Sequence, residues 1–265
     1  MVESMILLLA TNLVIILACM TLLWLVSLVI KDASIVDSFW GPGFVIVTWS
    51  TFAQTQGFLD RNILVSVLVT LWGMRLFLHI FTRNLGRGED YRYIEMRQKH
   101  GSRFPLVSYF TIFLFQGILM LIIASSVQIS QLSTLPDHWT WTDFIGAAVW
   151  LSGFYFEAVG DWQLRRFLAD QGNRGKVMDR GLWALTRHPN YFGEAVMWWG
   201  VFIIAAPLQY GFVTIISPLL ITFLLLRVSG VTLLEKGMMK KNPAYARYVE
   251  TTSSFVPWFK ERSGK

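Results

Sequence analysis

The sequence predicts an all-α integral membrane protein, a single domain over residues 1–265 built as a bundle of seven transmembrane helices. Hydrophobic residues make up 54% of the chain and charged residues 15%, a composition too apolar for an ordinary soluble surface. Residues 5–30 carry no charge and are long enough to cross a hydrocarbon core about 30 Å thick. Helix is the assignment because backbone groups in lipid must bond within their own segment, and the alternating pattern of a membrane barrel strand is absent from the sequence.

The first segment, residues 5–30, is expected to remain as a membrane helix rather than to be cleaved as a signal peptide. Its apolar run is longer than that of a signal sequence, Glu3 makes its start acidic, and no small-residue cleavage motif follows. Cys19, the one cysteine of the sequence, lies inside it, so neither a disulfide framework nor a cysteine metal site is expected. Because the four histidines are scattered, no metal is expected either.

Six further apolar segments follow, at about 33–52, 63–81, 106–130, 144–164, 191–208 and 212–234. With seven crossings and the N-terminus outside, the loops 82–105 and 165–190 share one side of the membrane with the tail, about 235–265. This side is rich in arginine and lysine, whereas the opposite loops hold Arg61 alone. The positive-inside rule therefore predicts that both loops and the C-terminus are cytoplasmic. The net charge of +6 is then explained by the basic cytoplasmic loops, which can bind lipid headgroups. No nucleic-acid partner is expected.

Six charged residues lie within these segments or at their ends, where charges are costly and usually face the interior of a bundle. They are Asp37, Arg75, Glu157, Asp161, Glu194 and Arg227. On the predicted topology all six lie in the cytoplasmic half of the membrane, so they predict a polar cavity open to the cytoplasm. Structural ion pairs, such as one between Asp37 and Arg75, are the alternative.

A stripe of charge runs along the fifth predicted helix. Glu157, Asp161 and Arg165 recur every four residues and therefore share one helical face. Asp161 and Arg165 could form an intrahelical ion pair. The same stripe would equally suit ribose hydroxyls for the acids and a phosphate for the arginine.

The stretch at 172–194 combines glycines and basic residues directly before the sixth predicted helix. Arg187, His188 and Asn190 can converge on a phosphate together with the free amides that begin this helix. Pro189 fixes the chain at the turn. His188 could instead be a hydrogen-bonding residue at the membrane interface.

The motif RHPNYFGE at 187–194 resembles a membrane superfamily that includes steroid 5-alpha-reductases, sterol reductases and isoprenylcysteine carboxyl methyltransferases. The wider pattern selects within it: DASIVDSFWG at 32–41, RNLGRGEDYRY at 83–93, the stripe from Glu157, and the ending NPAYARY…SSFVPWF. Over nearly the whole chain the sequence resembles the bacterial, DUF1295-like branch of the steroid 5-alpha-reductase family. This resemblance implies a seven-helix bundle whose cytoplasmic loops close over NADPH, with a lipid-like enone entering from the bilayer.

The resemblance also assigns roles to single positions. Asp37 falls close to the family's catalytic carboxylate, and Asn190 and Glu194 match residues near the nicotinamide end of the cofactor. The other residues expected to bind the cofactor are Arg75, Asn84, Arg87, Glu157, Asp161, Arg165, Lys176, Arg187, His188 and Glu235. Two departures leave the identity of the acid open. Trp72 or a neighbour stands where eukaryotic members carry a tyrosine, and Glu235 stands where they carry a tyrosine after the last helix.

The activity implied is NADPH-dependent reduction of the C4–C5 double bond of a 3-oxo-4-ene steroid or of a similar lipid enone. Hydride transfer to an enone places negative charge on the ketone oxygen, so a donor aimed at that oxygen is required. Asp37 could supply it as a protonated acid, and Tyr191 is the second candidate. We expect Asp37 and Glu194 to serve one active site, and the protein to act as a monomer.

Two other functions stay open. An S-adenosylmethionine-dependent methyltransferase of a membrane lipid or a prenylated substrate shares the motif RHP-x-Y-x-G. The basic clusters favour a dinucleotide over S-adenosylmethionine, because a dinucleotide carries more phosphate to bind. A non-enzymatic transporter or scaffold would also hold buried charges, but the paired repeats typical of transporters are not found in the sequence.

Overall fold

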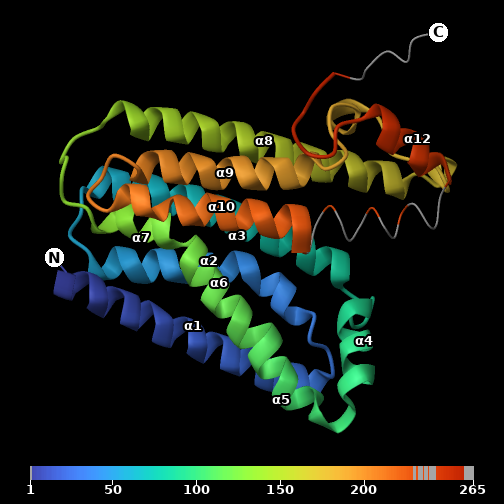
Figure 1. The fold of residues 1–265 in the computed structure, drawn as a ribbon, viewed down its shortest axis with the longest axis horizontal. Coiled ribbons are helices and arrows are strands. Elements are labelled where there is room, and N and C mark those ends of the chain that lie inside the picture. The colour runs from blue at the N-terminus through green and yellow to red at the C-terminus, as the bar shows by residue number, and fades with distance from the viewer. Residues whose placement is uncertain (1, 229–230, 232–234, 236–237, 239–242, 260–265) are drawn as a thin grey trace. The chain divides into compact units, whose positions relative to one another are not determined.

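The computed structural model describes residues 2–228, 231, 235, 238 and 243–259 of the 265-residue chain, and Figure 1 shows their arrangement. Within these residues every regular element is a helix, and no strand is found. The all-helical class predicted from the hydrophobic segments is therefore confirmed.

The helices follow the predicted apolar segments. The α-helices are α1 (Val2–Ile30), α2 (Ile35–Gln54), α3 (Leu59–Asn84), α4 (Tyr91–His100), α5 (Phe104–Ser108), α6 (Phe115–Ile123), α7 (Ser125–Leu132), α8 (Trp141–Ala169), α9 (Pro189–Ala205), α10 (Ile216–Phe223) and α12 (Pro243–Thr251). Short 3₁₀ or π-helical turns accompany them at η1 (Gly101–Arg103), η2 (Tyr109–Leu114), η3 (Gln171–Asn173), η4 (Gly181–Ala184), η5 (Gly211–Ile215) and η6 (Leu224–Val228). The end of the seventh predicted segment and much of the basic tail lie outside the described residues.

Four helical stretches of the described chain are long and apolar enough to cross a membrane, which supports an integral membrane protein. They are Met5–Ile30, Leu59–Asn84, Tyr91–Ile123 and Gly211–Val228. The remaining predicted spans correspond to α2, α8 and α9. Of these, α9 has 17 residues and α8 carries Glu157 and Asp161 in its second half. Membrane crossing by these three helices stays a prediction, and so does the seven-span topology.

Within residues 82–130 the structure differs from the prediction in two ways. The stretch 82–105, predicted as a loop, contains α4, which begins at Tyr91 after Asp90 caps its N-terminus. The stretch 106–130, predicted as one helix, is divided by the π-helical η2 and by a turn at Ala124 between α6 and α7. Both differences arise from local hydrogen bonding, which hydropathy does not record.

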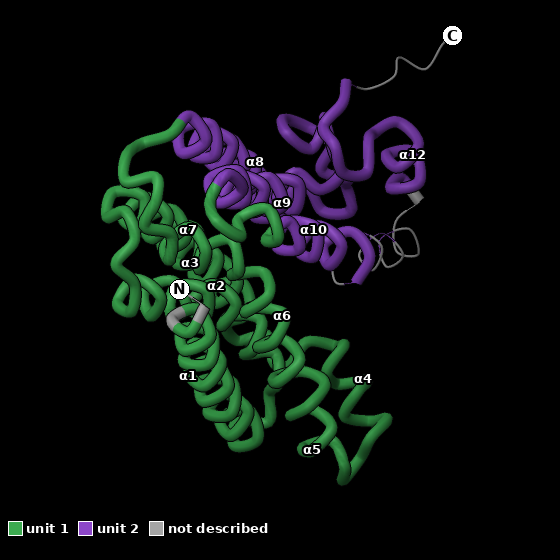
Figure 2. Tube along the Cα trace, turned by 60° about the vertical axis from the view of Figure 1, so that its left-hand side comes forward, with its two compact units in different colours: residues 1–140, 208–214 green, residues 141–207, 215–265 purple. Residues whose placement is uncertain are grey.

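The chain forms two compact units (Figure 2), residues 1–140 with 208–214 in unit 1 and residues 141–207 with 215–265 in unit 2. In unit 1, α2 and α3 approach so closely that a Cβ atom on Gly41 would lie 2.0 Å from the Gly73 carbonyl oxygen. Buried Asn12 of α1 donates to Thr51 of α2 at 2.9 Å and to Gln128 of α7 at 3.2 Å. Close backbone contact and a polar tie thus fix the helices of unit 1.

In unit 2, α8 and α9 pack side by side (Figure 1). Glycines recur every seven residues along the interface, at Gly146, Gly153 and Gly160 of α8 and at Gly193 and Gly200 of α9. A Cβ atom on Gly193 would lie 2.4 Å from the Glu157 backbone nitrogen. Glycines at such positions let two helices approach without intervening side chains. The repeat therefore brings Glu157 of α8 against the first turns of α9.

Candidate active site

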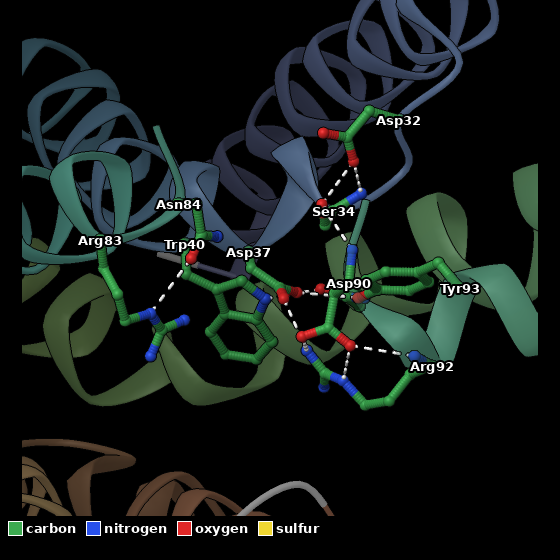
Figure 3. Close-up of polar contacts among 10 residues, drawn as sticks. Asp32, Ser34, Asp37, Trp40, Arg83, Asn84, Asp90, Arg92 and Tyr93 are labelled. Carbon is green, nitrogen blue, oxygen red and sulfur yellow. Dashed lines mark hydrogen bonds and ion pairs between the residues drawn. The ribbon is translucent and has the colours of Figure 1, made fainter. Parts of the chain in front are cut away.

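Asp37 lies in the first turn of α2, and the turn before this helix fixes its position (Figure 3). The Asp32 carboxylate accepts hydrogen bonds from the Ser34 backbone nitrogen, at 2.8 Å, and from the Ser34 hydroxyl. Local bonds of this kind favour a turn over continued helix. Asp37 is therefore held at the N-terminus of α2, where the helix dipole favours negative charge.

Both carboxylate oxygens of Asp37 accept hydrogen bonds from side chains of α4. Arg92 donates from Nη2 to Oδ2 at 2.7 Å, and the Tyr93 hydroxyl donates to Oδ1 at 2.8 Å (Figure 3). The Asp37 side chain is 18% exposed and Tyr93 is 7% exposed, so the cluster is largely shielded from solvent. Among the described residues, the ion-pair partner of Asp37 is thus Arg92 rather than Arg75, the partner considered from the sequence.

The segment before α4 is anchored to the start of α2. Glu89 accepts a hydrogen bond from the Ala33 backbone nitrogen at 2.8 Å and forms an ion pair with Arg97 at 2.7 Å. Asp90 caps α4 by accepting from the Arg92 backbone nitrogen at 3.0 Å. Burial opposes ionisation of both acids, but hydrogen bonds from Arg97 and Ala33 hold the pKa of Glu89 below its usual value. Hydrogen bonds from Arg92 lower the pKa of Asp90 in the same way, so two ionised acids hold α4 in place.

Arg75, Asn84 and Arg87, which the sequence predicts as phosphate ligands, lie on and after α3. Arg75 is half-buried within the helix, and Asn84 is its last residue, whose amide oxygen accepts from the preceding arginine at 3.1 Å. Arg87 is exposed between two glycines whose φ angles of 77° and 74° are in the left-handed region that glycine favours. The turn therefore leaves the Arg87 side chain accessible to a ligand.

Four predicted cofactor residues gather where α8 meets the start of α9. Asn190 donates from Nδ2 to Asp161 Oδ1 at 3.0 Å, and its Oδ1 accepts from the next backbone nitrogen at 3.0 Å. Glu157 lies one turn before Asp161 with its backbone against α9, and Glu194 lies one turn after Asn190. The side chains of Glu157, Asp161 and Glu194 are buried. The structure thus brings together acids and an amide from two helices.

The remaining candidates lie on α8, on α9 and in the loop between these helices. Tyr191, the second candidate for the proton donor, stacks on His188 with ring centroids 5.6 Å apart and planes inclined by 8°. Arg165 lies near the end of α8 and Lys176 in the following loop, and both are exposed. An anionic ligand can therefore reach both cations from solvent.

Arg187, His188 and Glu235 form a second buried cluster in unit 2. Arg187 binds Glu235 through two parallel hydrogen bonds, Nε to Oε1 at 2.7 Å and Nη2 to Oε2 at 3.1 Å. His188 Nε2 lies 3.0 Å from Glu235 Oε1. Burial opposes ionisation of Glu235, but its hydrogen bonds and charge contacts with His188 and Arg187 hold its pKa below the usual value. The structure shows these two residues in contact with Glu235, and the phosphate contact predicted for them stays a prediction.

Residues 249–258 of the tail pack on the loop that precedes α9. The Arg187 backbone nitrogen donates to the Ser253 carbonyl at 2.9 Å, and Arg187 Nη1 donates to the Val249 and Thr252 carbonyls at 2.8 and 2.6 Å. Farther along the tail, the Trp258 backbone nitrogen donates to the Leu185 carbonyl at 2.9 Å. Arg187 therefore ties the tail to the loop through both its backbone and its side chain.

Sequence reasoning missed Arg92 and Tyr93 as partners of Asp37. An acidic residue directly before a helical stretch is a helix-start signal, so Asp90 could have predicted α4 and placed both residues in its first turn. The pairing itself joins residues 55 positions apart, and no local pattern indicates it. The contact between Arg187 and Glu235, 48 positions apart, was missed for the same reason.

Apolar spans and buried polar clusters together define a helical membrane protein. The chain belongs to the family described as a protein of unknown function, DUF1295, which matches residues 23–252. This family is part of the steroid 5-alpha-reductase-like group.

Two known proteins are similar to the chain over different lengths. The uncharacterized protein C594.04c of Schizosaccharomyces pombe is 26% identical over 267 residues, which cover 89% of this chain and 75% of that protein. The steroid 5-alpha-reductase DET2 of Arabidopsis thaliana is 42% identical over 65 residues, which cover 24% of each chain. No solved structure matches the chain.

Proposed function

We propose that the protein is an NADPH-dependent membrane reductase that acts on the C4–C5 double bond of a 3-oxo-4-ene steroid or of a similar lipid enone. Membership of the steroid 5-alpha-reductase-like group and the local similarity to DET2 support a membrane reductase. The alignment covers 24% of DET2, so the cofactor, the substrate and the hydride transfer are all part of the proposal. The single structural observation that carries it is the cluster of Asp37, Arg92 and Tyr93.

This cluster has the groups needed to stabilise charge on a ketone oxygen. Bound NADPH would supply a hydride to the β carbon of the enone, which leaves the electron pair on that oxygen as an enolate. Asp37 and Tyr93 hold a proton at one place, since the Tyr93 hydroxyl lies 2.8 Å from Asp37 Oδ1. A donor fixed in a site that excludes water stabilises an enolate far more than solvent does. Tyr93 would take the place of the tyrosine that eukaryotic members carry where this chain has Trp72 or a neighbour. Arg92 neutralises the charge of the Asp37 carboxylate.

The polar residues where α8 meets the start of α9 suit a dinucleotide. The carboxylates of Asp161 and Glu157 could accept hydrogen bonds from ribose hydroxyls. The side-chain amide of Asn190, next to Asp161, could both donate to and accept from the carboxamide of the nicotinamide. Glu194 joins this set, as it faces the same way as Asn190 one turn earlier. The proposed phosphate ligands are Arg75, Asn84, Arg87, Arg165 and Lys176. The same site would be supported by the cluster of Arg187, His188 and Glu235. Its contacts hold the loop before α9 in place and attach the tail to that loop.

The proposal includes a seven-span topology in a bacterial inner membrane, with the C-terminus in the cytoplasm. The excess of arginine and lysine in alternate loops supports this orientation. A reporter that is active only outside the membrane, fused after residue 265, should then be silent, and one fused within residues 131–142 should be active. The reverse pattern would separate the proposed site from cytoplasmic NADPH.

Calorimetry on the detergent-purified protein tests the cofactor directly. NADPH should bind with a dissociation constant of about 1 μM or below, as expected for several charge-assisted contacts. Glu194→Gln should weaken this binding. Binding of S-adenosylmethionine without any response to NADPH would instead favour the methyltransferase, and binding of neither would favour a transporter or scaffold.

A further inference from the structure

A pocket of about 350 Å³, open to the surface and called the cavity below, lies at the C-terminal end of α8, between the last turns of the helix and the loop that follows. Its walls include Trp162, Arg166, Phe167, Asp170, Met178 and Arg180. All of them belong to unit 2. None of the residues proposed above for catalysis or cofactor binding lines the cavity, so its chemistry has no assigned purpose.

The cavity presents charges of both signs. Arg166 and Arg180 are exposed cations, and the Arg166 guanidinium carbon lies 5.6 Å from the centroid of the Trp162 ring. Asp170 is held in place because its carboxylate accepts from the Gly172 backbone nitrogen at 2.9 Å and from Asn173 Nδ2 at 3.3 Å. Two cations and one fixed carboxylate suit a ligand that carries both a phosphate and an ammonium group.

An exposed apolar stripe on α8 leads into the cavity. Phe144, Leu151, Tyr155 and Trp162 are exposed, and their spacing of 7, 4 and 7 residues places them on one helical face. The part of the stripe next to the cavity, from Leu151 to Trp162, spans roughly 17 Å along the helix axis. This length is about half the thickness of a hydrocarbon core of roughly 30 Å, so it matches the acyl chains of one leaflet. Trp162, which is 56% exposed, lies between the apolar stripe and the polar C-terminal end of α8. This position suits tryptophan, which is enriched at the interface between membrane and water.

We propose that the cavity binds the headgroup of an ethanolamine phospholipid, with an acyl chain lying along the α8 stripe. The phosphodiester would bind Arg166 and Arg180, and the primary ammonium would donate to Asp170. A phosphatidylglycerol headgroup offers no cation to Asp170. A choline headgroup carries no N–H to donate to it. Inorganic phosphate and other soluble anions lack the chain that the stripe would bind.

Binding of short-chain lipids to the full-length protein in detergent tests the proposal, with native mass spectrometry as the readout. A short-chain phosphatidylethanolamine should bind at least about tenfold more tightly than the matched phosphatidylglycerol, because one charge-assisted contact is gained. The double variant Arg166→Gln/Arg180→Gln should weaken phosphatidylethanolamine binding about tenfold or more. Asp170→Asn should remove the preference between the two lipids. The control Arg174→Gln removes one positive charge from the loop after α8 but lies outside the cavity, and it should bind as the wild type does.

A second measurement uses the wild-type protein alone. A phosphatidylethanolamine with a photoreactive headgroup should label the wild-type protein within residues 162–180. Labelling that is spread evenly over the chain would overturn the site. Equal binding of the two lipids by the wild type would overturn the headgroup assignment. Glycerophosphoethanolamine or inorganic phosphate binding as tightly as the lipid would overturn a lipid ligand, and displacement of the lipid by NADPH would assign the cavity to the cofactor.

Discussion

The Tyr93 hydroxyl donates a hydrogen bond of 2.8 Å to Oδ1 of Asp37, a residue 56 positions earlier in the sequence. The contact joins the first turn of α4 to the first turn of α2. Because Arg92 occupies the other carboxylate oxygen, Asp37 is held from both sides while 18% of its side chain stays exposed. A ligand can therefore reach a carboxylate whose orientation is already fixed.

Tyr93→Phe should lower turnover of a 3-oxo-4-ene steroid by about tenfold to a hundredfold, since it removes a proton-bearing group and keeps the ring. The lost hydrogen bond should cost about 1 kcal/mol in the free energy of unfolding. NADPH affinity should be unchanged. The matched control is Tyr91→Phe, because Tyr91 begins the same helix but is 55% exposed, and its turnover should equal that of the wild type. Equal turnover in both variants would leave Tyr93 with a packing role only.

Asp37→Asn keeps size and polarity but removes the acid. Turnover should fall by about a hundredfold or more, while NADPH still binds, because Tyr93 loses the carboxylate that orients its hydroxyl and the cofactor residues are untouched. NADPH consumption and calorimetry on the same preparation provide the two measurements.

The competing account is that Asp37 only stabilises the fold through Arg92. On that account Asp37→Asn lowers the melting temperature and leaves turnover per folded molecule nearly normal. Arg92→Gln separates the two, since it breaks the same ion pair and retains the acid. Loss of turnover in Asp37→Asn well beyond that in Arg92→Gln is expected, and equal losses would favour the structural account.

Glu235→Gln should destabilise the protein by about 3–5 kcal/mol, because Arg187 would remain buried without its counter-charge. The tail should then detach, and limited proteolysis should cut it between residues 248 and 258 faster than in the wild type. Exposed Glu250→Gln on α12 provides the control and should leave the cleavage rate unchanged.

The same contact sets a pH dependence. The pKa of Glu235 lies below its usual value of 4.5 in the folded protein, so its stabilising contribution is complete above that value. It is lost as the pH falls through the native pKa, when the carboxylate is protonated. Tail cleavage should therefore accelerate in acid in the wild type, and the Glu235→Gln variant should lack this step.

Gly193→Ala should prevent stable folding, because the added Cβ would lie 2.4 Å from the Glu157 backbone nitrogen and neither helix can yield locally. Gly160→Ala provides a graded comparison on the same interface. Its Cβ would lie 3.2 Å from a Pro189 ring carbon, so a small shift suffices. Yield of folded protein after size-exclusion chromatography should be far lower for Gly193→Ala, and similar yields would contradict the close packing of α8 on α9.

Hydropathy predicted where the helices are, because burial of apolar surface decides that a segment is helical in a membrane. It could not predict the turn at Ala124 or the existence of α4, since these follow from capping and local hydrogen bonds. Gly146, Gly153 and Gly160 were visible in the sequence as a seven-residue repeat. The repeat was informative only in combination with its partner glycines on α9.

The candidate site shows the same division. Asp37, Asp161 and Asn190 could be singled out because polar groups in apolar segments are costly and usually functional. The structure brings Asp161 and Asn190 into direct contact, as a shared site requires. The partner of Asp37 was missed because Arg92 lies outside the predicted segments, in a stretch read as a loop. A charge in a helix is detectable from sequence, whereas its counter-ion depends on the fold.

Isotope transfer tests the central claim most directly. Purified protein is incubated with a 3-oxo-4-ene steroid and NADPH that carries deuterium at the transferable position of the nicotinamide, and the product is analysed by mass spectrometry. A reduced steroid with a single deuterium at C5 is the predicted result, with its yield lowered in Asp37→Asn. An unchanged steroid would contradict a 3-oxo-4-ene steroid as the substrate, and a lipid methylated when S-adenosylmethionine is supplied would contradict the assignment as a reductase.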